Sequence, residues 1–143
     1  MALRDLVGQA LRMRPDRLVV GEVRDGAVVD LMAAMNTGHE GGCGTLHANS
    51  AADLPARIEA LALAAGLGRA AAHSQLASAL EVVLHMSRDR DGQRRLSEVA
   101  VLERDQAGLV RTSTATRIDR AGALMAGPAA GRLLDLIESR RRR

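Results

Sequence analysis

The stretch from residue 14 to residue 50 limits the fold of this chain more than any other part of it. Residues 17–20 form a short apolar run with a charged start, bounded by Pro15 and Gly21, and this pattern predicts a buried strand. Apolar residues then recur at intervals of three and four, which predicts a helix with one buried stripe. That stripe consists of Ala27, Val28, Leu31, Met32, Ala34 and Met35.

The ends of this helix and the segment after it complete a strand–helix–strand unit. Asp25 can cap the start of the helix, and Gly38 can close its end. The next extended run, residues 43–48, places Thr45 and His47 on one face of a second strand. The sequence therefore predicts an α/β fold with polar residues gathered at the strand ends, where ligands of parallel sheets bind.

The same region carries motifs of a known protein family. ALRMRPDRLVVGEVRD at residues 10–25 and AMNTGHEGGCGTLHANS at residues 34–50 resemble the ATPases of type II and type IV secretion systems. Within that superfamily the Tad pilus assembly ATPases (CpaF-like or TadA-like) are most similar, and the likeness extends over residues 3–105. It implies part of a RecA-like P-loop NTPase core, a parallel sheet with helices, followed by a small antiparallel β-element.

The resemblance assigns catalytic roles to three residues near the strand ends. Glu22 matches the Walker B glutamate, which orients or deprotonates the water that attacks a γ-phosphate. His47 lies in the family's histidine box, TLHANS, where imidazole suits γ-phosphate sensing because it donates hydrogen bonds and titrates near neutral pH. Arg24 matches the family's GE-[IV]-R pattern and would neutralise charge on the transferring phosphoryl group.

Three further residues are expected to contribute to cofactor binding. His39 belongs to the family's TGH motif, Thr45 lies beside His47, and Arg12 precedes the first strand. The resemblance implies ATP and Mg²⁺ as the cofactors. Taken one at a time, Glu22 and the arginines also fit ordinary solvated side chains, and His47 fits a satisfied histidine at a strand end. It is the motif context that favours the functional interpretation.

The chain lacks the phosphate-binding loop of the family. That loop follows the pattern G-x-x-x-x-G-K-[ST] and needs its lysine, whereas all 20 basic residues here are arginine. In the family this loop lies upstream of the motifs found here. We therefore expect a C-terminal portion of a secretion motor with negligible ATPase activity when isolated. The alternative is a non-catalytic module or relic that associates with full-length ATPase subunits.

Composition bears on compartment and partners. No apolar run approaches the roughly 20 residues of a membrane span, and the N-terminus has no signal-peptide pattern, so a cytoplasmic location is expected. The resemblance adds a homo-hexamer and a platform protein of the inner membrane as partners, which would hold the protein at the inner face of that membrane. The net charge of +3 depends on the terminal arginines 140–143 and aromatic residues are absent, so no nucleic-acid partner is expected.

The remainder of the chain divides into helices, strands and a linker. Two helices are predicted near residues 54–65 and 70–80, and Asp91-Gly92 predicts a hairpin between strands at 81–88 and 94–103. A weak strand is expected at 109–116, a linker within 112–131, and a short amphipathic helix at 132–139 that leads into the arginine-rich tail. The predicted parts are therefore residues 1–105, 106–131 and 132–143.

One spacing raises the question of a metal site. His39, Cys43 and His47 recur every fourth residue, which would align them on a helix as zinc ligands. The glycines between them oppose a helix and a fourth ligand is missing, so no metal is expected. Cys43 is interpreted as a small buried residue. His73 and His85 belong to no recognisable constellation.

Overall fold

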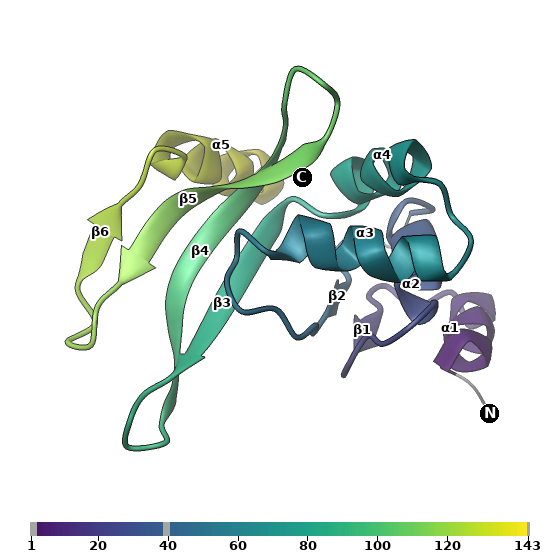
Figure 1. Ribbon diagram of the computed structural model, residues 1–143, viewed down its shortest axis with the longest axis horizontal. Helices are drawn as coiled ribbons and strands as arrows, with labels where there is room; N and C mark the ends of the chain where they lie inside the picture. Colours follow the sequence, from purple (N-terminus) through teal and green to yellow (C-terminus); the bar gives the residue numbers. More distant parts are fainter. Residues whose placement is uncertain (1–2, 39–40, 143) are drawn as a thin grey trace.

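A computed structural model describes residues 3–38 and 41–142 of the 143-residue chain. The helices α1 to α4 gather on one side of the molecule, and an antiparallel sheet with α5 occupies the other (Figure 1), which confirms the predicted α/β class. In chain order the elements are α1 (Leu3–Arg12), β1 (Val19–Val20), α2 (Ala27–Met35), β2 (Cys43–Gly44), α3 (Leu54–Ala64), α4 (Arg69–Ala79), β3 (Val82–Arg88), β4 (Arg94–Arg104), β5 (Val110–Ile118), β6 (Leu124–Ala126) and α5 (Ala130–Arg141).

The predicted strand–helix–strand unit is present as β1, α2 and β2. The two strands are parallel, with Val19 opposite Cys43 and Val20 opposite Gly44. Both are shorter than the predicted strands 17–20 and 43–48, although backbone hydrogen bonds extend the pairing by a residue or more. The amide of Cys43 donates to Leu18 at 2.9 Å, and the amide of Val23 donates to Thr45 at 2.8 Å.

A glycine allows β2 to lie close against α2. A Cβ atom on Gly44 would stand 2.9 Å from Cδ2 of Leu31 on α2 and 3.1 Å from Cγ2 of Val23, so a larger residue would push the strand away. The residues after Gly44 alternate as predicted: Thr45 and His47 are exposed, and Leu46 packs against the core. Cys43 shares the outward face and is exposed, so the prediction that it is buried was wrong.

The predicted cap of α2 is also corrected. Gly26 is the N-cap residue, and no side chain caps the helix. Asp25 instead has a left-handed backbone with φ of 50°, because the chain turns sharply between β1 and α2, and aspartate tolerates that region better than most residues. At the other end the C-cap is Asn36, and Gly38 follows with φ of +96°.

The two predicted helices beyond residue 50 are confirmed as α3 and α4. Asp53 is the N-cap of α3, and its amide donates a hydrogen bond to Ser50 Oγ at 3.2 Å. Gly66, with φ of +88°, ends the helix as expected. The amides of Gly66 and Leu67 donate back into the last turn of α3, which is the Schellman pattern.

The antiparallel sheet has the order β3-β4-β5-β6. The predicted hairpin at Asp91-Gly92 is confirmed, and register shifts on both sides of β4 explain the imperfect alternation of its apolar residues. The predicted linker within 112–131 was wrong, because this segment contains β5, β6 and the start of α5. Its small polar composition is overridden by pairing with β4, and the predicted boundary after residue 105 falls in the turn of that pair.

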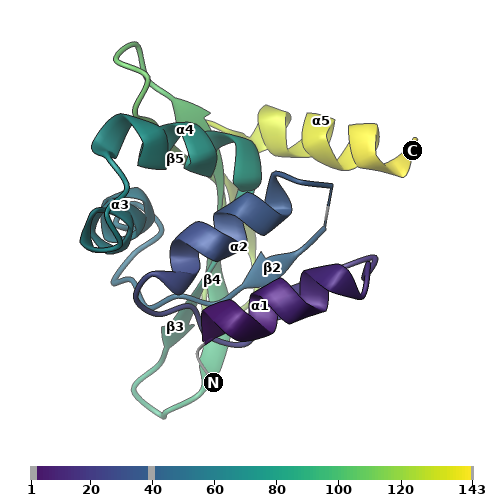
Figure 2. The same cartoon turned by 90° about the vertical axis from the view of Figure 1, so that its right-hand side faces the viewer.

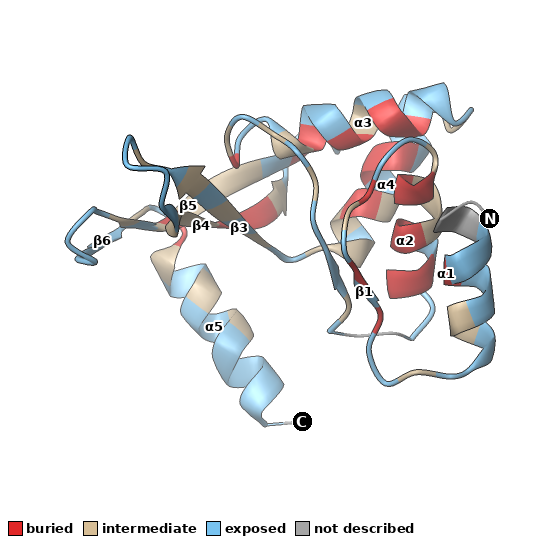
Figure 3. Cartoon of the chain, turned by 90° about the horizontal axis from the view of Figure 1, so that it is seen from below, coloured by how far each residue is buried: buried red, intermediate tan, exposed pale blue. Residues whose placement is uncertain are grey.

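Two cores lie on opposite faces of this sheet (Figure 2). Leu102 and Val110 belong to the larger core together with α2, α3 and α4, whereas the adjacent Val101 packs with Ala115 and α5. Buried residues concentrate in α2, α3 and α4, and α5 is mostly exposed (Figure 3). None of the helices in the described part of the chain has the length and hydropathy of a membrane span.

Candidate functional site

The candidate site lies where β1 and β2 end. Because the strands are parallel, the residues that follow them emerge at the same edge of the pair. Glu22 is the second residue after β1, and His47 is the third residue after β2. The hydrogen bond from the Val23 amide to the Thr45 carbonyl keeps the two emerging segments together.

Three predicted catalytic residues meet at this edge. Arg24 Nη2 donates to Glu22 Oε2 at 2.8 Å, and His47 Nε2 lies 3.0 Å from Glu22 Oε1. Each carboxylate oxygen therefore faces one cationic or protonatable group. The side chain of Glu22 is 34% exposed and its Oε1 atom is buried, whereas the side chains of Arg24 and His47 are 72% and 88% exposed.

The surroundings of Glu22 favour its charged form. The hydrogen bond from Arg24 holds the pKa of the Glu22 carboxyl below its ordinary value of 4.5, and the partial burial of the group opposes this shift. The charge of Arg24 and the proximity of His47 lower the pKa of Glu22 further. Glu22 is therefore a carboxylate at neutral pH, the form that can accept a proton from water or face a hydrated cation.

Thr45, predicted to contact the cofactor, is engaged with the protein backbone. Its hydroxyl donates to the carbonyl of Gly21, the residue immediately before Glu22. Thr45 therefore lies in the same cluster as Glu22 and His47, as its position on the predicted strand suggested.

The other predicted site residues lie elsewhere. Arg12 is the last residue of α1, is exposed, and takes no part in the hydrogen bonds and ion pairs of Glu22, Arg24 and His47. His39 is outside the described residues, so its prediction stays open. In residues 3–38 and 41–142, no group of three or more His, Cys, Asp or Glu side chains forms a metal-binding cluster.

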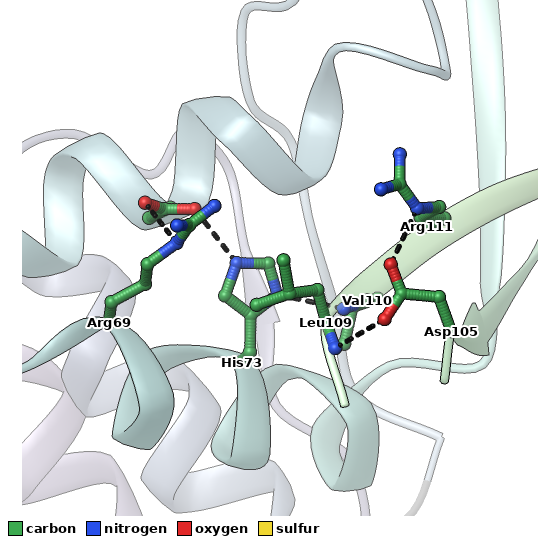
Figure 4. Close-up of polar contacts among 7 residues, drawn as sticks. Arg69, His73, Asp105, Leu109, Val110 and Arg111 are labelled. Atoms are coloured by element: carbon green, nitrogen blue, oxygen red, sulfur yellow. Dashed lines mark hydrogen bonds and ion pairs between the residues drawn. The ribbon is translucent and has the colours of Figure 1, made fainter. Parts of the chain in front are cut away.

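A second Glu–His–Arg cluster escaped the sequence analysis. His73 on α4 is only 5% exposed, and its Nε2 lies 2.8 Å from Oε2 of Glu59 on α3, which Arg69 also contacts at 3.0 Å (Figure 4). The amide of Val110 on β5 donates to His73 Nδ1 at 2.8 Å, so Nδ1 is the acceptor and Nε2 carries the proton toward Glu59.

This buried cluster, named for its buried histidine, joins α3, α4 and β5; its other two members are partly exposed, Glu59 at 21% and Arg69 at 61%. One signal was available, because His73 lies three residues before Leu76 on the buried stripe of α4. Its partners were not predictable from local pattern, since Glu59 is 14 residues away and Val110 is 37 residues away. The statement that His73 belongs to no constellation was wrong.

Comparison with known families identifies the family of this chain. Residues 1–124 match the family described as type II/IV secretion system protein. The chain belongs to this family. A protein of Mycobacterium tuberculosis that carries a conjugal transfer name is 58% identical over 140 residues, which are 98% of this chain and 38% of that protein. The conjugal transfer protein TrbB of Rhizobium radiobacter is 39% identical over 98 residues, 68% of this chain and 29% of TrbB.

A solved structure agrees with this assignment. The VirB11 ATPase of the Brucella suis type IV secretion system, crystallised with sulphate, superimposes with a TM-score of 0.63 and 28% identity. The match covers 69% of this chain and 31% of the VirB11 chain. The chain thus spans about a third of the length of these relatives.

Proposed function

We propose that this chain is the part of a secretion or conjugal transfer ATPase that supplies the water-activating carboxylate and the γ-phosphate sensor. The observation that carries the proposal is the meeting of Glu22, Arg24 and His47 at the ends of β1 and β2. Family membership supports ATP as the nucleotide, with Mg²⁺ as its companion ion.

The roles follow from the chemistry of the three side chains. Glu22, ionised and 34% exposed, can orient water or deprotonate it in line with a terminal phosphate. His47 is held within 3.0 Å of that carboxylate and can exchange this contact for one to phosphate oxygens. Arg24 is 72% exposed and can exchange its contact with Glu22 for one that neutralises charge on the phosphoryl group.

Hydrolysis also requires groups that this sequence does not contain. Without a lysine there is no phosphate-binding loop of the G-x-x-x-x-G-K-[ST] type to hold the nucleotide. Val19 on β1 is 70% exposed although parallel strands are normally covered on both faces, which fits a strand that another part of a longer motor covers. We therefore propose that the chain contributes to hydrolysis only in combination with such a part.

A fusion protein tests the function directly. The upstream portion of the mycobacterial relative, joined ahead of this chain, should hydrolyse ATP, whereas this chain alone should not exceed the buffer rate. Glu22→Gln in the fusion should lower kcat by about 100-fold or more, because a general base is lost. The matched control Glu138→Gln removes a carboxylate from an exposed pair on α5 and should leave kcat unchanged. A fusion whose hydrolysis survives Glu22→Gln would refute the role of Glu22.

A finer proposal concerns which secretion system this ATPase powers. The relatives named above bear conjugal transfer and type IV secretion names, which favour that class over Tad pilus assembly. Assembly into a homo-hexamer beside an inner-membrane platform protein follows from the resemblance alone and stays a proposal. The alternative, a non-catalytic module that joins full-length subunits, is favoured if the chain co-purifies with such subunits but the fusion is inactive.

A further inference from the structure

Thr45 makes three hydrogen bonds that enclose Glu22. Its amide donates to the carbonyl of Val20 at 3.3 Å, and its own carbonyl accepts from the amide of Val23 at 2.8 Å. Its hydroxyl donates to the carbonyl of Gly21. The residues before and after Glu22 are thus bonded to one residue of the neighbouring segment.

Of these three bonds, only the one from the hydroxyl depends on the identity of the side chain. Any residue other than proline could provide the backbone pair, but the bond to Gly21 needs a hydroxyl at position 45. Gly21 has no side chain to restrict its peptide, and a Cβ there would meet nothing within 4 Å, so no neighbour crowds this position on its side-chain face.

Thr45 also shares a face with His47. The alternating exposure after β2 points both side chains outward, while Leu46 between them packs against the core. The same short segment therefore restrains the peptide before Glu22 and presents the imidazole to Glu22 Oε1.

We infer that Thr45 is a positioning residue, whose hydroxyl fixes the Gly21 peptide so that the Glu22 carboxylate meets Arg24 and His47. Thr45 acts through Glu22 and needs no contact with nucleotide for this role. The inference rests on the proposed function only where Glu22 is given a part in hydrolysis, since the bond of the Thr45 hydroxyl and the contacts of Glu22 do not depend on that role.

The test is a titration of the Glu22 carboxyl by NMR in the 143-residue chain, without nucleotide. Thr45→Val keeps the branched shape and the backbone bonds but removes the hydroxyl, so the pKa of Glu22 should rise toward its ordinary value of 4.5. Thr45→Ser keeps the hydroxyl and should titrate as the unchanged chain does. The matched control is Thr112→Val, which removes a hydroxyl bond to the Ala51 carbonyl away from Glu22 and should leave its titration unaltered.

Two outcomes would overturn the inference. In the first, Glu22 titrates in Thr45→Val as it does in the unchanged chain. In the second, Thr45→Ser shifts the Glu22 titration as much as Thr45→Val does, which would make the hydroxyl irrelevant. In the ATPase fusion, Thr45→Val should lower kcat by about 10-fold to 100-fold with little change in KM, because a misplaced base affects the chemical step. An inactive fusion would count against the proposed function alone, since the titration requires no hydrolysis.

Discussion

The chain contains two clusters of the same composition whose histidines lie in opposite environments. Glu22, His47 and Arg24 meet at the exposed ends of β1 and β2, and Glu59, His73 and Arg69 meet where α3, α4 and β5 pack together. The histidine of the first cluster is 88% exposed and that of the second is 5% exposed. The comparison shows that residue type alone does not determine whether the histidine of such a cluster is exposed or buried.

The hydrogen bonds of the two histidines explain the difference. His73 uses both ring nitrogens, one toward Glu59 and one from the amide of Val110, so its orientation and its proton are fixed by three elements. Within residues 3–38 and 41–142, His47 forms an ion pair with Glu22 alone, and its side chain is 88% exposed. The buried arrangement suits a side chain that holds a helix to a strand, and the exposed one is compatible with the proposed γ-phosphate sensor.

The largest expected effect is on stability. His73→Ala should lower the free energy of unfolding by about 3 kcal/mol, because it opens a cavity and leaves the buried Val110 amide without an acceptor. His47→Ala, at an exposed position, should change it by less than about 0.5 kcal/mol. Chemical denaturation followed by circular dichroism measures both values. Equal losses for the two variants would contradict the structural role assigned to the buried cluster.

An effect of intermediate size is expected on folding stability when the pH is lowered. The pKa of Glu59 is lowered from its ordinary 4.5, first by the hydrogen bond with His73, and the pKa of Glu22 is lowered first by Arg24. A carboxyl whose pKa is lowered on folding contributes its full stability above pH 4.5 and loses that contribution as the pH falls through the folded value. Both carboxylates should therefore favour the folded state at neutral pH and cease to do so in acid.

The dependence on salt distinguishes the contribution of Glu59 to this acid transition from that of Glu22. Melting temperatures recorded from pH 7 to pH 2 should depend less on pH in Glu59→Gln than in the unchanged chain, and this difference should persist in 0.5 M salt. Glu22→Gln should alter the profile only at low salt, because its partners are exposed and screened. Profiles that respond to salt in the same way would show that burial does not distinguish the clusters.

The smallest expected effect concerns which partner lowers the pKa of the glutamate more, the arginine or the histidine. The two clusters should differ in this respect. Arg24→Gln should raise the pKa of Glu22 more than His47→Ala does, because the hydrogen bond from Arg24 is the largest cause of the shift. In the buried cluster the order is opposite, and His73→Asn should raise the pKa of Glu59 more than Arg69→Gln does. Carboxyl NMR titrations of the four variants compare the two orders. The same order in both clusters would remove the electrostatic difference between them.

Much of the fold could be predicted because many helix ends and turns depend on a few residues that are adjacent in sequence. The hairpin at Asp91-Gly92 and the end of α3 at Gly66 depend on backbone conformations that glycine adopts easily, and both are confirmed. The linker was mispredicted because Thr112 to Ile118 form a strand only when β4 lies beside them. Cys43 was mispredicted because its face depends on how Gly44 lies against α2.

The sequence by itself determined the order of the motifs, the βαβ unit and the lack of a lysine for phosphate binding. The family motifs also predict that Glu22, Arg24, Thr45 and His47 belong to one site. Only the tertiary structure decided which histidine is buried, and that the Thr45 hydroxyl turns toward Gly21. The physical reason is that burial and hydrogen-bond partners depend on residues distant in the chain. Secondary structure and motif spacing depend on residues that are close in sequence.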